Sequence, residues 1–201
     1  MTEIKENLFL NTYGLVLSGG NSIRMGADKS MLQYFEKPQR YHVYELLQPF
    51  CEKVFISCNE QQVNSLEPGY SFVKDHASYK NIGPMAALLS AFDLFPEKNI
   101  LLIGCDYPFL MAEELAPFSI QCRETPAAFY NREANKYEPM LAWYPATSFH
   151  ALQAMYHALQ FSLQQFLVKQ NAAKYYPAGK HSIVSVDTPA DFIKTVSLLN
   201  P

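Results

Sequence analysis

The residues best suited to chemistry lie within residues 14–32, GLVLSGGNSIRMGADKSML. The apolar run 15–17 is typical of a buried strand, and small residues follow it directly. Glycines at such a point allow a sharp turn and let backbone N–H groups approach a phosphate closely. Arg24 and Lys29 add positive charge in the same stretch. The pattern indicates a loop that cradles a nucleotide triphosphate.

A plainer interpretation of this loop stays open on these residues alone. A Gly-Gly pair after a strand is more often an ordinary turn, and two basic residues beside it are more often a solvated loop. Two known phosphate motifs are also missing from the sequence. It has no G-x-x-x-x-G-K-[ST], and the glycines at 19, 20 and 26 do not form G-x-G-x-x-G.

Two acidic residues are candidates for the same site. Asp106 follows the apolar run 100–103, which predicts a central strand of a parallel sheet. A carboxylate just beyond such a strand favours a magnesium ligand, although a helix N-cap is an equal alternative without further support. Asp75 ends another predicted strand, where a turn or cap residue is the commoner role.

The elements that position these residues alternate between strands and helices. This order predicts an α/β fold, a Rossmann-like three-layer sandwich with a mostly parallel sheet. We expect strands at 13–17, 54–56, 72–73 and 100–103, and helices at 40–50, 61–66, 84–95 and 112–117. Ligands of such sheets bind at the carboxyl ends of the strands, which here carry Ser18, Ser57, Asp75 and Asp106.

The C-terminal half predicts a less regular arrangement. Strands at 127–130 and 139–144, joined by a turn, indicate an antiparallel excursion of the sheet. We expect a largely helical stretch at 147–169, a strand at 182–186 and a helix at 189–199, capped by Asp187 or Thr188. The 201 residues fit a single domain, residues 1–201.

Composition limits the partners and the compartment. The chain is 49% hydrophobic and 17% charged, with a net charge of −3, so nothing favours nucleic acid or an anionic membrane surface as a partner. The sequence shows no secretion signal and no apolar run of membrane-spanning length. Its four cysteines form no C-x-x-C pair, which favours reduced thiols and a cytoplasmic protein.

The loop sequence resembles a family signature. Residues 17–29, LSGGNSIRMGADK, fill every fixed position of L-[AS]-G-G-x-S-x-R-M-G-x-D-K, which is typical of the MobA family of molybdenum cofactor guanylyltransferases in the nucleotidyltransferase superfamily. GPMAA at 83–87 and LLIGCDYPFL around Asp106 are similar to further family segments. SVDTP at 185–189 departs from the family's N-[VI]-N-T-P, because both asparagines are replaced.

The resemblance implies transfer of GMP from GTP to molybdenum-molybdopterin, with Mg²⁺ as cofactor. The resemblance implies that the chain binds GTP and molybdenum-molybdopterin. It also allows binding to other proteins of molybdenum cofactor biosynthesis. Asp106 would bind the metal, and Gly20 would leave room for a purine base. The implied catalytic residues are Arg24, Lys29 and Asp106, and the implied nucleotide-binding residues are Leu17, Ser18, Gly19, Gly20, Lys29, Ser57, Asp75 and Asp106.

Other functions remain open at this point. Within the enzymes, the same loop suits a molybdopterin cytidylyltransferase or a sugar-phosphate nucleotidylyltransferase. A non-catalytic GTP-binding protein is the alternative from another class, because the C-terminal asparagines of the family are changed here. The joint presence of Arg24, Lys29 and Asp106 favours an enzyme.

Overall fold

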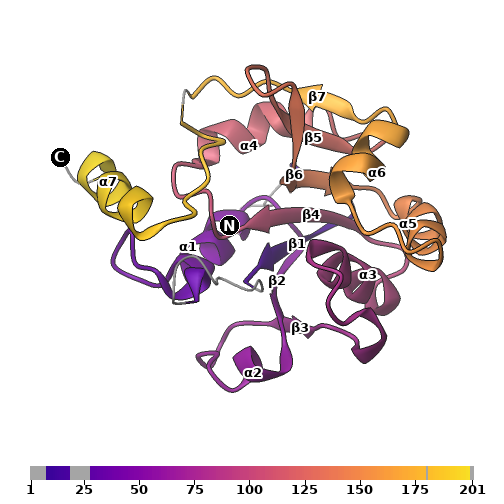
Figure 1. The fold of residues 1–201 in the computed structure, drawn as a ribbon, viewed down its shortest axis with the longest axis horizontal. Helices are drawn as coiled ribbons and strands as arrows, with labels where there is room; N and C mark the ends of the chain where they lie inside the picture. Colours follow the sequence, from indigo (N-terminus) through magenta and orange to yellow (C-terminus); the bar gives the residue numbers. More distant parts are fainter. Residues whose placement is uncertain (1–7, 19–27, 180, 200–201) are drawn as a thin grey trace, which may run out of the picture.

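The computed structural model describes residues 8–18, 28–179 and 181–199. In these ranges the chain forms a seven-stranded sheet with the order β3-β2-β1-β4-β6-β5-β7 (Figure 1). The strands are β1 (Thr12–Leu17), β2 (Lys53–Cys58), β3 (Phe72–Lys74), β4 (Asn99–Gly104), β5 (Ala127–Asn131), β6 (Lys136–Tyr144) and β7 (Ala173–Tyr175).

The pairing of the strands confirms the predicted fold class. β1 is parallel to both β2 and β4, and β2 is parallel to β3. β6 is antiparallel to β4 and to β5, which is the expected excursion, and β7 adds to β5 in parallel. The chain order runs outward from β1 to β3 on one side and continues with β4 on the other. The strand order therefore reverses at the carboxyl ends of β1 and β4, which form the switch point of the sheet.

Helices cover both faces of the sheet. The apolar side chains of α1 (Gln39–Leu47) and α4 (Ala112–Ser119) pack on one face, and those of α3 (Pro84–Leu94), α5 (Ser148–His157) and α6 (Leu163–Lys169) pack on the other. The remaining elements are α2 (Glu60–Val63), α7 (Pro189–Leu199) and the 3-10 turns η1 (Lys29–Met31) and η2 (Ala77–Tyr79). No helix in the described ranges has the length and hydropathy needed to span a bilayer.

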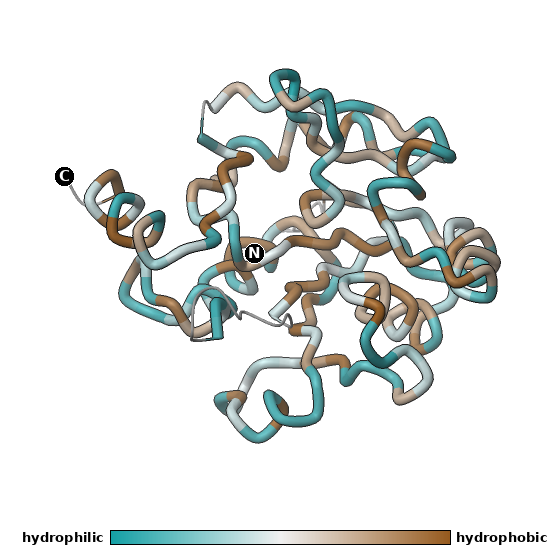
Figure 2. The backbone as a smooth tube through the Cα atoms, in the orientation of Figure 1, coloured by the Kyte–Doolittle hydropathy of each residue, from teal (hydrophilic) through white to brown (hydrophobic). Residues whose placement is uncertain are grey.

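The central strand β4 shows why the sheet has two covered faces. Leu101 and Ile103 point into the core beneath α1 and α4, whereas Ile100 and Leu102 point into the core beneath α3 and α5. All four are at most 1% exposed. Successive side chains of a strand alternate between faces, so an unbroken apolar run requires cover on both. In Figure 2 this strand is a continuous hydrophobic line through the middle of the molecule.

Two details of the C-terminal half differ from the sequence prediction. The predicted strand at 182–186 is wrong, because residues 181–183 form a turn and residues 184–187 join no sheet. The seventh strand is instead the short Ala173–Tyr175. The helical stretch at 147–169 is interrupted, with Leu159 at a φ of 57° between α5 and α6.

Candidate active site

A row of polar groups links the carboxyl ends of β1, β2 and β3. The Ser18 hydroxyl donates to the backbone oxygen of Ser57 at 2.5 Å, and the Ser57 hydroxyl donates to Asp75 Oδ1 at 2.9 Å. Burial raises the pKa of the Asp75 carboxyl, and the hydrogen bond from Ser57 opposes that rise. Hydroxyl and carboxylate groups therefore line the carboxyl ends of β1, β2 and β3.

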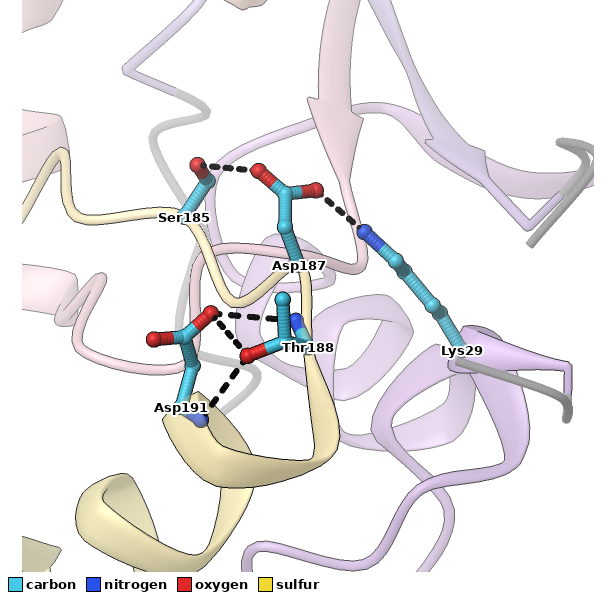
Figure 3. A network of polar contacts seen from close by, with 5 residues as sticks. All are labelled: Lys29, Ser185, Asp187, Thr188 and Asp191. Atoms are coloured by element: carbon cyan, nitrogen blue, oxygen red, sulfur yellow. Dashed lines mark hydrogen bonds and ion pairs between the residues drawn. The ribbon is translucent and has the colours of Figure 1, made fainter. Parts of the chain in front are cut away.

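A second group, made of Lys29, Asp106 and Asp187, lies at the switch point. Lys29 Nζ donates to Asp187 Oδ1 at 2.5 Å, and Asp187 Oδ2 accepts from the Ser185 hydroxyl at 3.3 Å (Figure 3). Lys29 opens η1 immediately after the loop, whereas Asp187 comes from the segment before α7. Residues far apart in the sequence therefore meet at this point.

Asp106 is electrostatically coupled to both partners of that ion pair. Burial raises the pKa of its carboxyl to about 6. The carboxyl's own backbone N–H and the positive charge of Lys29 lower this pKa, and the negative charges of Asp187 and Glu138 raise it. The backbone oxygen of Asp106 also accepts from the N–H of Val186 at 2.9 Å, which ties the segment before α7 to the end of β4.

The backbone around Asp106 fits this carboxylate closely. Gly104 ends β4, and a Cβ atom at that position would overlap Asp106 Oδ1. The carboxylate thus folds back over the strand end into space that any other residue would fill. Tyr107 follows, and its hydroxyl donates to Glu138 Oε2 at 3.0 Å.

A helix cap fixes the position of Asp187. The Thr188 hydroxyl accepts from the N–H of Asp191 at 3.2 Å, and Asp191 Oδ2 accepts from the N–H of Thr188 at 3.0 Å (Figure 3). This reciprocal pair is a capping box at the start of α7. It confirms the prediction that Thr188 caps the helix. Asp187 is the residue that directly precedes this cap.

The structure brings the described candidates onto one edge of the sheet. Leu17 pairs with Ser57 on one side and with Gly104 on the other, so β1 lies between the two groups of polar residues. Gly19, Gly20 and Arg24, which the sequence also predicts for this site, lie outside the described residues. The arrangement combines an ammonium group with carboxylates at a switch point, which suits the binding of phosphates and a divalent cation.

Sequence reasoning missed Asp187 as a member of this site. The motif SVDTP was visible as a departure from the family pattern, but its aspartate was considered only as a candidate helix cap. The available signal was the T-P pair, which predicts a helix start and so a fixed position for the residue before it. Its partner, Lys29, could not be found from spacing, because the two residues are 158 positions apart.

The comparison with family models decides the classification. The model described as the MobA-like NTP transferase domain matches residues 14–174, which is most of the chain. The chain belongs to this family. It is therefore a member of the nucleotidyltransferases, as the loop signature predicted.

Similar proteins agree with this membership. A molybdenum cofactor guanylyltransferase of Pseudomonas syringae is 27% identical over 178 residues, which cover 87% of this chain and 88% of the relative. A molybdenum cofactor biosynthesis bifunctional protein of Synechocystis is 29% identical over 187 residues. That match covers 90% of this chain but 52% of the relative, so the chain spans about half the length of the bifunctional protein.

A solved structure supports the fold. Molybdopterin-guanine dinucleotide biosynthesis protein A from Archaeoglobus fulgidus superposes with a TM-score of 0.77 at 21% sequence identity. The superposition covers 92% of this chain and 97% of the other. The sheet and its flanking helices are therefore those of a MobA-like nucleotidyltransferase.

Proposed function

We propose that this chain transfers GMP from GTP to the terminal phosphate of molybdenum-molybdopterin, giving the guanine dinucleotide cofactor and pyrophosphate. The observation that carries the proposal is that Lys29 and Asp106 are brought together at the switch point. Lys29 pairs with Asp187 at 2.5 Å, and the neighbouring Val186 donates its N–H to the backbone oxygen of Asp106 at 2.9 Å. Membership of the MobA-like family and the names of the relatives support the choice of substrates.

The chemistry asks mainly for positioning and charge neutralisation. The attacking phosphate is already an anion, so no general base has to remove a proton. Lys29 holds the triphosphate as a point charge, and Arg24 supports the charge that develops on pyrophosphate. Backbone N–H groups of residues 18–21, of which only Ser18 is described, would cradle the β and γ phosphates. Ser57 and Asp75 then contact the nucleoside part of GTP.

The donor set fits magnesium. Asp106 offers carboxylate oxygens, and burial with the nearby charges of Asp187 and Glu138 makes its anionic form costly without a cation. The described residues contain no group of three or more histidines, cysteines and acids able to hold a metal. Magnesium suits this setting, because it takes one or two carboxylates and completes its shell with phosphate oxygens and water. Bound by Asp106, it would draw negative charge away from the α phosphorus.

The proposal extends to the organisation and location of the chain. We propose one nucleotidyltransferase domain over residues 1–201, supported by a single sheet that joins every described strand. We propose a cytoplasmic location, where GTP is available. All four cysteines are described and free, and three of them are buried, which is compatible with a reducing compartment.

A nucleotide competition assay tests the function. The purified protein is incubated with molybdenum-molybdopterin, Mg²⁺ and labelled GTP, CTP or UTP, and both the dinucleotide product and pyrophosphate are measured. We expect GTP to be consumed and to outcompete the two pyrimidine nucleotides. Preferred use of CTP would identify a cytidylyltransferase. Transfer of a nucleotide to a sugar phosphate alone would identify a sugar-phosphate nucleotidylyltransferase.

A binding measurement separates the enzyme from a passive nucleotide-binding protein. Equilibrium dialysis with GTP and Mg²⁺ is run beside the transfer assay on the same preparation. Bound GTP that is never consumed in the presence of molybdenum-molybdopterin would refute the proposed transfer reaction. The expected result is weaker GTP binding and strongly reduced transfer in Lys29→Ala, with neither changed in Lys98→Ala. Lys98 is a matched control, because it forms an ion pair with Glu52 beside the amino end of β4.

A further inference from the structure

One side-chain amide connects the two ends of the candidate phosphate loop. Gln62 Nε2 donates to the backbone oxygen of Ser18 at 2.9 Å and to Asp28 Oδ2 at 2.8 Å. Ser18 directly precedes residues 19–27, and Asp28 directly follows them. Gln62 itself belongs to α2 and is 9% exposed. A single buried NH₂ group therefore joins both flanks of the loop to a third element.

The orientation of the Gln62 side-chain amide is fixed by the hydrogen bond that its oxygen accepts. Gln62 Oε1 accepts from the N–H of Asn59 at 3.2 Å, while Asn59 Oδ1 accepts from the N–H of Gln62 at 3.0 Å. The pair forms the capping box of α2. Because the amide oxygen is used by the cap, the NH₂ end must face the loop, and the network leaves no choice of amide orientation.

The backbone of Gln62 is also held from the protein interior. Its carbonyl oxygen accepts from the Ser65 hydroxyl at 2.8 Å. Ser65 in turn accepts from the guanidinium of Arg40, through its hydroxyl at 3.2 Å and through its backbone oxygen. Arg40 is fully buried. The amide thus extends from a turn that a buried cation holds in place, and it does not depend on a mobile surface contact.

The contact with Asp28 leads directly to Lys29. Asp28 Oδ1 accepts from the backbone N–H of Ser30 at 2.9 Å and from its hydroxyl at 2.7 Å, which caps η1. Lys29 is the first residue of η1. One carboxylate oxygen of Asp28 therefore orients the turn that carries Lys29, and the other is held by Gln62.

We propose that Gln62 is a positioning residue for nucleotide binding: it joins Ser18 to Asp28, the two residues that flank positions 19–27, and so sets the position from which Lys29 meets a triphosphate. The inference rests on the proposed function for the identity of the ligand. Removal of the amide leaves a buried carbonyl and a carboxylate oxygen without this donor. Since a lost hydrogen bond to a charged group is worth at least about tenfold in an equilibrium constant, we expect GTP·Mg²⁺ to bind about tenfold more weakly.

The experiment compares three single variants of the full chain. Gln62→Ala removes the amide. Gln62→Glu keeps the acceptor for Asn59 but places a carboxylate against Asp28. Gln61→Ala is the matched control, because Gln61 is exposed on the same turn of helix. GTP·Mg²⁺ affinity is measured by titration calorimetry, thermal unfolding is recorded for each variant, and the rate of tryptic cleavage after Arg24 is followed without ligand.

The expected result has two parts. Both Gln62 variants bind GTP·Mg²⁺ about tenfold more weakly and are cut faster after Arg24, while Gln61→Ala matches the wild type in both. A double variant, Gln62→Glu with Asp28→Asn, reverses the donor and acceptor of the contact and keeps the cap of η1. It should recover only the part of the affinity that depends on the contact with Asp28, because the carboxylate at position 62 cannot donate to the backbone oxygen of Ser18. A general loss of stability would give no such recovery.

Two outcomes would overturn the inference. One is cleavage after Arg24 at the wild-type rate in Gln62→Ala. The other is unchanged GTP affinity in both single variants while the wild type binds GTP. If the wild type itself fails to bind GTP, the proposed function has failed, and the cleavage rates still decide whether Gln62 holds the loop. In the transfer assay the effect should fall on KM for GTP more than on kcat, because the residue acts before chemistry.

Discussion

Replacement of Asp106 by asparagine should abolish transfer and yet stabilise the fold at neutral pH. The carboxyl has a pKa of about 6 in the folded chain against an ordinary value of 3.8, mainly because of burial. Its protonated form is therefore favoured by folding, and its charged form is disfavoured. A difference of about 2 pKa units corresponds to at most about 3 kcal/mol, and contact with water at the partly buried site reduces that figure.

The pH dependence gives the sign of the effect. Below about pH 4, Asp106 is protonated in both the folded and the unfolded chain. Its favourable contribution to the free energy of unfolding is then fully present. As the pH rises through about 6, the folded carboxyl ionises and the contribution is lost. Denaturant unfolding of wild type and Asp106→Asn, in EDTA at pH values from 4 to 8, should show the variant gaining relative stability as the pH rises. The largest gain is expected above pH 7.

A control of opposite sign is available in α7. Asp191 has a pKa below its ordinary value of 3.8, first because it accepts a hydrogen bond from Thr188, so its stabilising contribution is lost as the pH falls below about 4. Asp191→Asn, measured also at pH values below 4, should therefore lose relative stability as the pH rises toward 4 and change little between pH 5 and 8. If Asp106→Asn is less stable than the wild type at pH 8, or if its advantage does not change with pH, the reasoning about a buried charge is refuted. In a separate measurement, addition of Mg²⁺ should stabilise the wild type at pH 8 and leave Asp106→Asn unchanged, because the proposal assigns the ion to the Asp106 carboxylate.

Three further substitutions probe the same edge. Lys29→Ala should lower kcat by about 10²–10³ with little change in Tm, and near-normal transfer would exclude the residue from catalysis. Asp187→Asn removes the anion that competes with phosphate for Lys29, so GTP should bind about threefold more tightly in calorimetry; weaker binding would show that Asp187 assists the ligand instead. Gly104→Ala should reduce transfer strongly, because the new Cβ displaces the flexible end of Asp106. Its thermal unfolding should stay close to wild type, and a large loss of Tm would contradict that explanation.

The central sheet could be predicted because its pattern is locally complete. Within β4 the four residues 100–103 are all apolar, and only a strand covered on both faces explains such an unbroken run. The strand predicted at 182–186 shows the limit of the same reasoning. Val186 is 1% exposed, so the burial that this apolar residue predicts is confirmed at this position. Val184 in the same segment is 41% exposed, so the segment is not buried throughout. Val186 donates its N–H to the backbone oxygen of Asp106, and that contact has no periodic signature.

The short strand β7 was missed for a related reason. Ala173, Lys174 and Tyr175 show no strong alternation, and β7 pairs with the edge of β5 in parallel. The break between α5 and α6 also had only a weak signal. Ser162 caps α6 by accepting from the N–H of Gln165 at 3.2 Å, and a cap residue inside a helical stretch predicts a restart.

For the site, the sequence predicted strand ends better than it predicted contacts. Ser57, Asp75 and Asp106 follow directly from where apolar runs stop, and the fold brings those ends to one edge. The capping box of Asn59 and Gln62 also had a sequence signature, since an asparagine followed three residues later by glutamine marks a helix start. What no pattern could supply is that the same glutamine reaches Ser18 and Asp28, because those contacts depend on how α2 sits against β1.

The charge balance of this edge explains why a divalent cation belongs to the proposed reaction. The chain has a net charge of −3, so no general positive field draws a triphosphate toward it. In the described part of the switch point, Lys29 faces the carboxylates of Asp106 and Asp187, with Glu138 close enough to raise the pKa of Asp106. A triphosphate brought into this group would add negative charge to an edge that already carries it. In the proposed reaction Asp106 would hold a magnesium ion, whose positive charge would offset that repulsion, and the carboxylate that is costly to ionise alone would be stabilised by the ion.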